Sequence, residues 1–203
     1  MAAYLMTHSL LSSWLYAISD NPYEDATTER DPMEEFMQVL RREPTETTEA
    51  MQKGIDFEDL VTDIVNGHGD PENKWFAAAQ KVAAIVSGGQ LQYKSRRRIT
   101  VSGMEFVLYG RLDCLKAGTI VDIKFSSGYD RGKYFDSTQH PTYMEIIPEA
   151  VQFVYVISNG TEVWTEPYRR DEVTDIKPII SDFISWLDAV GLMPVYKEKW
   201  LAL

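Results

Sequence analysis

The sequence predicts one α/β domain over residues 1–203, in which helices flank a mixed central β-sheet. Apolar residues follow a helical spacing up to about residue 87 and alternate, as in strands, from about residue 96. One further helical segment interrupts the strand series, and this order is typical of a mixed sheet. Hydrophobic residues make up 44% of the chain, which is enough to bury a substantial core.

Amphipathic spacing predicts the first helix over residues 7–19, with Thr7 or Ser9 as its N-cap. Its apolar side is formed by Leu10, Leu11, Trp14, Leu15 and Ile18. An acidic stretch, residues 20–50, follows and is expected to be the most mobile part of the chain. The other helices expected before the sheet are a short one near Pro32–Arg42, one over 47–66 ended by Asn66-Gly67, and one over 72–87 ended by Gly88-Gly89.

Five strands are expected, separated by the turn pairs Ser102-Gly103, Ala117-Gly118 and Asn159-Gly160 and by a helix around Ser137–Ile147. The strands are Arg96–Ser102, Glu105–Lys116, Thr119–Phe125, Val151–Ser158 and Glu162–Tyr168. A closing helix over Val173–Val190 has a regular apolar side and is followed by Gly191.

The net charge of −11 is distributed unevenly along the chain. Residues 20–63 hold 14 acidic against 4 basic residues, whereas residues 64–203 are nearly neutral. Residues 73–104 contain no acid, and their basic residues are Lys74, Lys81, Lys94, Arg96, Arg97 and Arg98. A polyanion could respond to this local patch, because distant acids are screened. Alternatively, the three consecutive arginines protect a strand edge from aggregation.

Cys114 is the sole cysteine, which excludes intrachain disulfides, Cys-ligated zinc and iron–sulfur clusters held within the chain. No apolar run approaches the roughly 18 residues that a membrane span needs, so a cytoplasmic protein without a membrane partner is expected. The three histidines have no spacing typical of a metal site or catalytic triad, and His140 is expected at the surface.

Two aspartates are expected to meet across a hairpin. If Lys116 and Thr119 close a two-residue loop at Ala117-Gly118, Asp113 lies opposite Asp122, with Lys124 on the same face. Facing carboxylates repel each other unless a positive charge neutralises them, and a divalent cation could do so. A three-residue loop would instead place Asp113 opposite Val121.

A third acid, Glu58, falls on a row of the helix 47–66 that is otherwise mostly apolar. The row consists of Met51, Ile55, Glu58, Thr62 and Val65. A carboxylate at the edge of a core requires a partner, either a metal or a basic residue of the sheet. Glu58, Asp113 and Asp122 are hard oxygen donors, which suit Mg²⁺ or Mn²⁺.

These residues resemble the PD-(D/E)XK nuclease superfamily, in particular its RecB-like and phage lambda-exonuclease-like branches. The resemblance covers about residues 54–168 and depends on four motifs in the family's order. They are Gly54-x-x-x-Glu58, Gly110-x-x-Asp113, Asp122-Ile-Lys124 and Gln139-x-x-x-Tyr143. The chain lacks the four cysteines of cluster-bearing relatives and has no phosphate-binding loop of a helicase motor.

The resemblance implies a restriction-endonuclease-like core and a Mg²⁺- or Mn²⁺-dependent deoxyribonuclease. The metal ligands would be Glu58, Asp113, Asp122 and the carbonyl of Ile123, while Lys124 would act on the attacking water. Gln139 and Tyr143 would position Lys124 or the DNA backbone. Candidate phosphate contacts are Arg96, Arg97, Arg98, Arg111, Arg131 and Lys133.

The implied substrate is linear double-stranded DNA, cut from an end during recombination, repair or phage DNA processing. A homo-oligomer that encircles DNA, and a recombination or annealing protein as partner, are expected from the same resemblance. Two alternatives stay open: a DNA- or protein-binding module on a nuclease fold that does not cut, and an acidic interaction protein that acts through residues 20–50.

Overall fold

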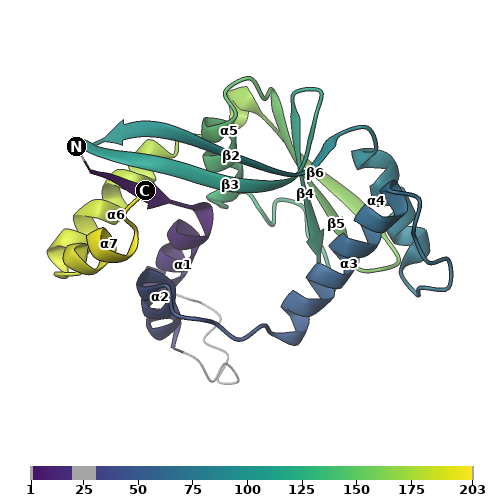
Figure 1. The fold of residues 1–203 in the computed structure, drawn as a ribbon, viewed down its shortest axis with the longest axis horizontal. Coiled ribbons are helices and arrows are strands. Elements are labelled where there is room, and N and C mark those ends of the chain that lie inside the picture. The colour runs from purple at the N-terminus through teal and green to yellow at the C-terminus, as the bar shows by residue number, and fades with distance from the viewer. Residues whose placement is uncertain (1, 20–30, 203) are drawn as a thin grey trace.

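A computed structural model describes residues 2–19 and 31–202 of the chain, and the expectation of mobility for 20–30 lies outside them. Its strands form one sheet in the order β1-β3-β4-β5-β6, with β2 also paired to β3 (Figure 1). The pairs β1–β3 and β4–β5 are parallel and the others antiparallel, so the predicted mixed sheet is confirmed. The strands are β1 (Ala3–Met6), β2 (Gln90–Val101), β3 (Met104–Lys116), β4 (Thr119–Phe125), β5 (Gln152–Ser158) and β6 (Val163–Arg169).

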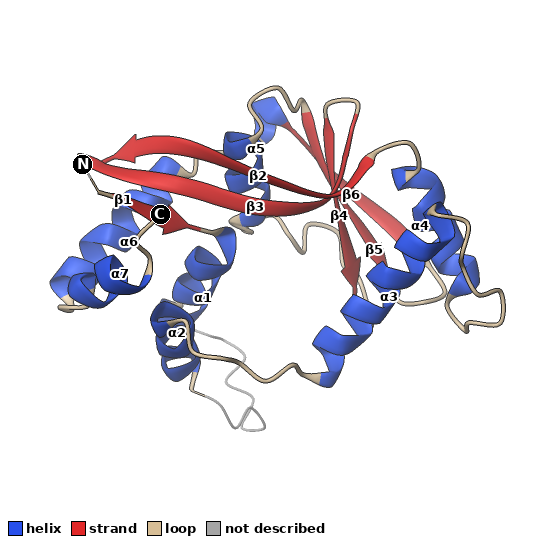
Figure 2. Cartoon of the chain, viewed as in Figure 1, coloured by secondary structure: helices blue, strands red, loops and turns tan. Residues whose placement is uncertain are grey.

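Helices cover both faces of this sheet (Figure 2). A larger core joins one face to the first, second, fifth, sixth and seventh helices, and a smaller core joins the other face to the third and fourth. The helices are α1 (His8–Ile18), α2 (Pro32–Arg41), α3 (Glu49–Val65), α4 (Phe76–Val86), α5 (Gln139–Ile146), α6 (Lys177–Ala189) and α7 (Met193–Lys199), with a 3₁₀ turn at Arg170–Glu172.

Helix boundaries follow the local caps. Thr7 accepts a hydrogen bond from Leu10 N and begins α1, as one of the two predicted caps. The closing helix begins at Lys177 and not at Val173, because the 3₁₀ turn comes first and Asp175 accepts a hydrogen bond from Lys177 N at 3.0 Å. Among the described residues, no single helix is long and apolar enough to cross a membrane. Helices α6 and α7, which are bent by 117° relative to each other, together have the length and composition of a membrane span.

The strand β1 and the helix α7 were not predicted, and each depends on the other end of the chain. Leu5 N donates to Trp200 O at 2.6 Å, and the Tyr196 hydroxyl donates to Leu5 O at 2.8 Å. Ala202 N donates to Ala3 O at 2.9 Å. Such short segments are stabilised by long-range pairing, which a local sequence pattern does not contain.

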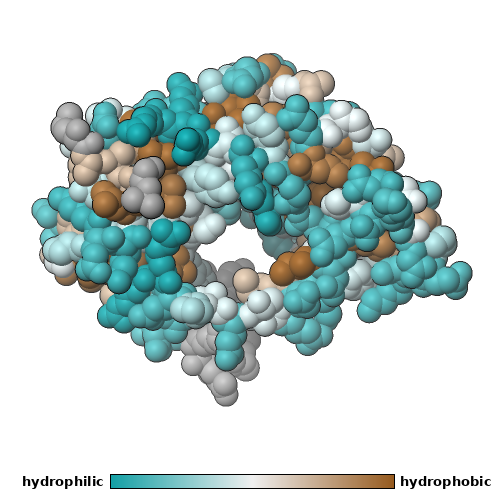
Figure 3. All heavy atoms as spheres, viewed as in Figure 1, coloured by the Kyte–Doolittle hydropathy of each residue, from teal (hydrophilic) through white to brown (hydrophobic). Residues whose placement is uncertain are grey.

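The mostly apolar row predicted on α3 is not the side of the helix that is buried. Met51 and Ile55 of that row are 53% and 46% exposed, whereas the buried residues Phe57, Leu60 and Val61 lie outside it. The first turns of α3 extend beyond the sheet, and no helix or strand among the described residues covers them (Figure 1). Figure 3 shows an opening through the molecule on this side, between the part that contains α1 and α2 and the part that contains α3.

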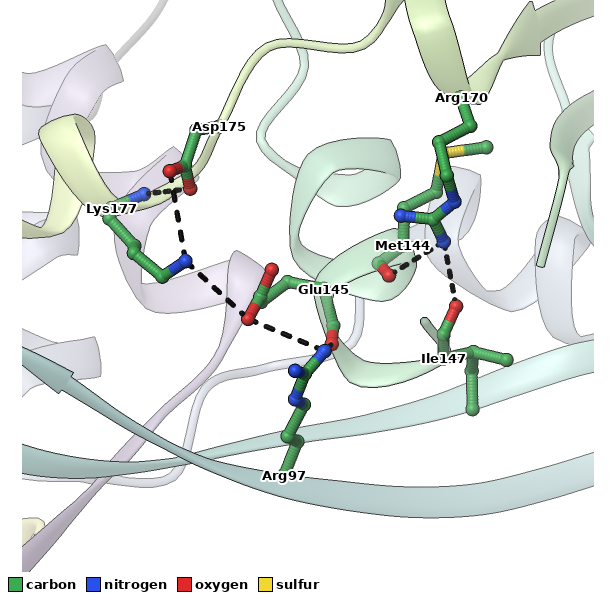
Figure 4. Close-up of polar contacts among 7 residues, drawn as sticks. All are labelled: Arg97, Met144, Glu145, Ile147, Arg170, Asp175 and Lys177. Carbon is green, nitrogen blue, oxygen red and sulfur yellow. Dashed lines mark hydrogen bonds and ion pairs between the residues drawn. The ribbon is translucent and has the colours of Figure 1, made fainter. Parts of the chain in front are cut away.

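Helix α5 is clamped at its C-terminal end by two arginines (Figure 4). The Arg170 guanidinium donates to Met144 O at 2.9 Å and to Ile147 O at 2.8 Å, and it also bonds Ala150 O. Arg97 donates to Glu145 O at 2.8 Å. These bonds satisfy carbonyls that an isolated helix end leaves without partners. The clamp therefore fixes the helix that carries Gln139 and Tyr143.

We expect Arg170→Ala to lower the free energy of unfolding by about 3 kcal/mol, because it removes charge-assisted hydrogen bonds to three carbonyls. The melting temperature of a chain this long should fall by about 6–12 °C. Its matched control is Arg169→Ala, since the Arg169 side chain is 68% exposed and its contact is an ion pair with Asp171. Equal melting temperatures for the two variants would contradict the clamp.

Candidate active site

The hairpin between β3 and β4 has the predicted register. Lys116 pairs with Thr119, and Cys114 pairs with Val121, which excludes the alternative three-residue loop. The ladder ends there, so Asp113 and Asp122 are not backbone partners across it. Instead, the Oδ2 atom of Asp113 accepts a hydrogen bond from Ile123 N at 2.7 Å. The two strands thus separate at the point where both aspartates lie, and the Asp113 carboxylate fills the gap.

Asp122 is buried, with 3% of its surface exposed, and has partners on two sides. Lys124 Nζ lies 2.8 Å from Asp122 Oδ2. The Gln139 amide, at the start of α5, donates to Asp122 Oδ1. One turn further along α5, the Tyr143 hydroxyl donates to Arg111 O at 3.1 Å. The fourth motif is therefore in contact with the second and third.

Glu58 lies on α3, and its side chain lines a pocket together with Asp113 and Asp122. Its carboxylate accepts a hydrogen bond from the Gln92 side chain, an amide in place of the basic sheet residue that was one of its two predicted partners. Gln92 lies on β2 with a φ of 51°. Gln92 and Asp113 are the opposed residues missing from the β2–β3 ladder, whose register is the same on both sides of them. The start of β2 was not predicted, although residues 90–94 alternate between polar and apolar side chains.

One pocket of about 340 Å³ contains all six residues predicted to be catalytic. They are Glu58, Asp113, Asp122, Lys124, Gln139 and Tyr143, and Ile123 and Arg111 also line it. Four different elements supply these residues, so the sequence motifs converge only in the folded chain.

The carboxylates of this pocket affect one another. Burial raises the pKa of Asp113 well above its usual range, and the charges of Asp122 and Glu58 raise it further. Burial likewise raises the pKa values of Asp122 and Glu58. For Lys124, burial lowers the pKa, but Asp122 and Asp113 outweigh it and the net shift is upward. Lys124 is therefore a positive charge in a pocket that stabilises positive charge.

The packing of the Tyr143 ring explains why a glycine stands at position 110 in the second motif. A Cβ atom added there would lie 2.7 Å from Cε1 of Tyr143, so the glycine lets that ring approach the strand. Gly54 of the first motif has no such reason, since nothing lies within 4 Å of a Cβ added to it.

His8 lines the pocket and was not predicted to do so. Its ring meets that of Tyr143 edge to face at 5.3 Å. Burial, together with the charge of Lys124, lowers the pKa of His8 to about 4, so it is neutral at pH 7. Its position at the start of α1 brings a segment some fifty residues before Glu58 into the pocket, and no motif of the sequence signals this.

The expectation that His140 lies at the surface is wrong. The residue is 4% exposed, and its ring stacks on Tyr168 at 4.2 Å. Its Nδ1 atom lies 3.2 Å from the Tyr155 hydroxyl. Burial lowers the pKa of His140 to about 4. The side chain is part of the packing beneath α5, which the polar neighbours in the sequence did not indicate.

The candidate phosphate-contact residues do not form one cluster. Arg111 lines the pocket, whereas Arg97 is engaged in the α5 clamp. Arg98 lies 3.6 Å from Glu105, and Lys133 donates to Ser126 Oγ at 2.8 Å. Arg96 and Arg131 are exposed. Arg111 is thus the member of this set that the fold brings to the carboxylates.

The donor set fits a hard divalent cation by its chemistry, because it brings three carboxylates into one pocket. There the charges of Asp122 and Glu58 raise the pKa of Asp113, and the charge of Asp122 raises that of Glu58. Each of them has a protein partner instead: Gln92 for Glu58, Ile123 N for Asp113, and Lys124 for Asp122. Within residues 2–19 and 31–202, no group of three His, Cys, Asp or Glu side chains is arranged to hold one ion.

Comparison with known proteins informs the fold. No family model matches the sequence, and no curated protein matches it. The solved structures that match include one described as "Crystal structure of SSO0001", with a TM-score of 0.53 and 14% sequence identity. The alignment covers 92% of this chain and 78% of that chain. This likeness supports the α/β fold over nearly the whole chain.

Proposed function

We propose that this protein is a metal-dependent deoxyribonuclease of the PD-(D/E)XK type with a restriction-endonuclease-like core. The observation that carries the proposal is the convergence of Asp113, Asp122 and Lys124 with Glu58 and Gln139 in one pocket. The sequence Asp-Ile-Lys occurs a second time, at Asp175-Ile-Lys177, where it lies at the start of α6. Among the described residues, the carboxylates that pair with Lys177 there are Asp175 and Glu145, and no second aspartate does. The two Asp-Ile-Lys sequences therefore differ in their surroundings, and the one at Asp122 lies among other carboxylates.

The chemistry assigned to the pocket is the hydrolysis of a phosphodiester. Glu58, Asp113, Asp122 and the carbonyl of Ile123 would hold Mg²⁺ or Mn²⁺, which supplies Lewis-acid polarisation of the phosphate and a more acidic water. Lys124, which is held by Asp122 at 2.8 Å, orients the attacking water and stabilises negative charge on the phosphate. Gln139 fixes the Asp122 carboxylate. Arg111 provides a phosphate contact at the edge of the pocket.

The proposed substrate is linear double-stranded DNA, cut from an end, in recombination, repair or phage DNA processing. A cytoplasmic protein, a homo-oligomer and a recombination or annealing partner belong to the same proposal.

A second candidate function is a DNA-binding module that does not cut. One observation favours it: each carboxylate of the pocket already has a protein partner, and no described group of three ligands is ready for an ion.

The two candidates are separated by incubating linear and closed circular DNA of one sequence with the protein in Mg²⁺, Mn²⁺ or EDTA. We expect progressive shortening of the linear DNA with either metal, intact circles, and no cleavage in EDTA. Cutting of closed circles would indicate an endonuclease instead. Retarded but uncut DNA in all three conditions would favour the binding module.

A further inference from the structure

A second pocket, which we call the aromatic pocket, has a volume of about 440 Å³ and lies beside the loop that joins β4 to α5. Its aromatic lining comprises Tyr129, Phe135, Trp164 and Tyr168. Phe135 is 68% exposed, which is unusual for a phenylalanine. The rings of Tyr129 and Trp164 lie 5.7 Å apart and are inclined by 35°. Tyr129, Trp164 and the exposed ring of Phe135 thus line a space of the size that small ligands occupy.

The sheet register places this pocket on the same face as the candidate active site. Lys124 pairs with Ile157 of β5, and Ile157 pairs with Trp164 of β6, so the three side chains form one row across the sheet. Neighbouring strands are about 4.8 Å apart, so Trp164 lies roughly 10 Å from Lys124 along this row. That separation corresponds to about three base steps of a nucleic acid strand at 3.4 Å each.

The buried carboxylate of Glu166 holds the loop in place. It lies in the row that runs from Asp122 through Tyr155, and it is 6% exposed. It accepts hydrogen bonds from the Tyr129 hydroxyl at 2.6 Å, from Gly132 N at 3.1 Å and from Tyr134 N at 3.2 Å. Despite burial, these donors lower the pKa of Glu166. The pocket wall is therefore fixed before any ligand binds, and its acid is already paired.

The charge of the loop does not favour a phosphate clamp. Asp130 and Asp136 balance Arg131 and Lys133, and the Lys133 ammonium is occupied by Ser126 Oγ and Gly128 O. Arg131 is the remaining cation that lines the pocket. Ring faces, and not positive charge, are thus the main binding surface. Such surfaces bind the flat faces of unpaired bases without regard to sequence.

We propose that the aromatic pocket binds an unpaired base of the DNA strand whose phosphate lies at Lys124. The base stacks on Phe135 and Trp164, and Arg131 contacts the adjoining backbone. The inference rests on the proposed function for the identity of the polymer, and it adds a requirement: a few bases beside the cleaved bond must be unpaired. A frayed or resected DNA end meets this requirement.

The test measures binding in EDTA, so that it does not depend on cleavage. Fluorescence anisotropy compares a short single-stranded thymidine oligonucleotide with an abasic oligonucleotide of the same length and charge, at one salt concentration. We expect Phe135→Ala to weaken binding of the thymidine oligonucleotide about tenfold and to leave binding of the abasic one unchanged. Phe135→Tyr, which keeps the ring, should restore binding.

Val190→Ala is the matched control, because it removes an apolar side chain that is 49% exposed and lies outside both pockets. Equal losses for the two oligonucleotides, or no loss in Phe135→Ala, would overturn the inference. Cleavage of linear DNA in Mg²⁺ is measured separately on the wild-type protein. Intact cleavage without base-dependent binding overturns this inference alone, whereas base-dependent binding without cleavage supports the pocket and overturns the nuclease.

Discussion

Lys124→Ala should reduce Mg²⁺-dependent cleavage of linear DNA by at least about a thousandfold, the scale of loss when one preorganised charge is removed from a reaction centre. The ammonium lies 2.8 Å from Asp122, so the variant also leaves a buried carboxylate without its cation. We therefore expect the free energy of unfolding to fall by about 1–3 kcal/mol, with the fold retained. Cleavage rates and a denaturant titration of the same preparations measure both effects.

The control for Lys124→Ala is Lys177→Ala, which changes the lysine of the other Asp-Ile-Lys sequence. Lys177 is 42% exposed and lies 3.7 Å from Asp175 and 3.8 Å from Glu145, at the surface beside the α5 clamp (Figure 4). Its loss should leave cleavage unchanged. Wild-type cleavage by a purified Lys124→Ala protein would refute the nuclease assignment.

Sequence patterns predicted most of the sheet because local signals dominate there. The β3–β4 hairpin depends on two turn residues and alternating side chains. Its register was predicted correctly, and its strand ends agree except that β3 begins at Met104 and not at Glu105. Long-range features were not accessible in this way. The strand β1 is stabilised by its pairing with β3. The first half of α3 has apolar residues that stay exposed because no described helix or strand packs against them.

The residues of the candidate site that belong to sequence motifs could be predicted, whereas those brought to it only by the fold could not. Spacing alone predicted that Asp113, Asp122 and Lys124 meet, and the resemblance implied that Glu58, Gln139 and Tyr143 join them. The structure places all six in one pocket. Gln92 and His8 were missed, since an amide and a single histidine carry no signal in their own segments. Arg97 was assigned to phosphate from its charge, but its position beneath α5 gives it a carbonyl partner.

Asp113→Asn should also strongly reduce cleavage, and unlike the lysine variant it should stabilise the protein in EDTA. The substitution keeps the size of the side chain and an oxygen that can accept from Ile123 N. It removes a charge that burial, Asp122 and Glu58 all disfavour, as the raised pKa of Asp113 shows. We expect cleavage to fall by about a hundredfold or more and the free energy of unfolding to rise by about 1 kcal/mol at pH 7.

The pH dependence distinguishes this gain from a general packing effect. A carboxyl group whose pKa is higher in the folded than in the unfolded chain binds more protons when folded, so its ionisation costs stability as the pH rises from the unfolded pKa, about 3.9, through the folded value. Denaturant titrations in EDTA should therefore show the variant and wild-type protein equally stable near pH 3.5 and the variant more stable at pH 7. Asp63→Asn, which changes an exposed carboxylate of α3, should show no such divergence. If Asp113→Asn is less stable than the wild-type protein at pH 7, the hydrogen bond from Ile123 N outweighs the repulsion, and the three carboxylates then do not require a cation to coexist.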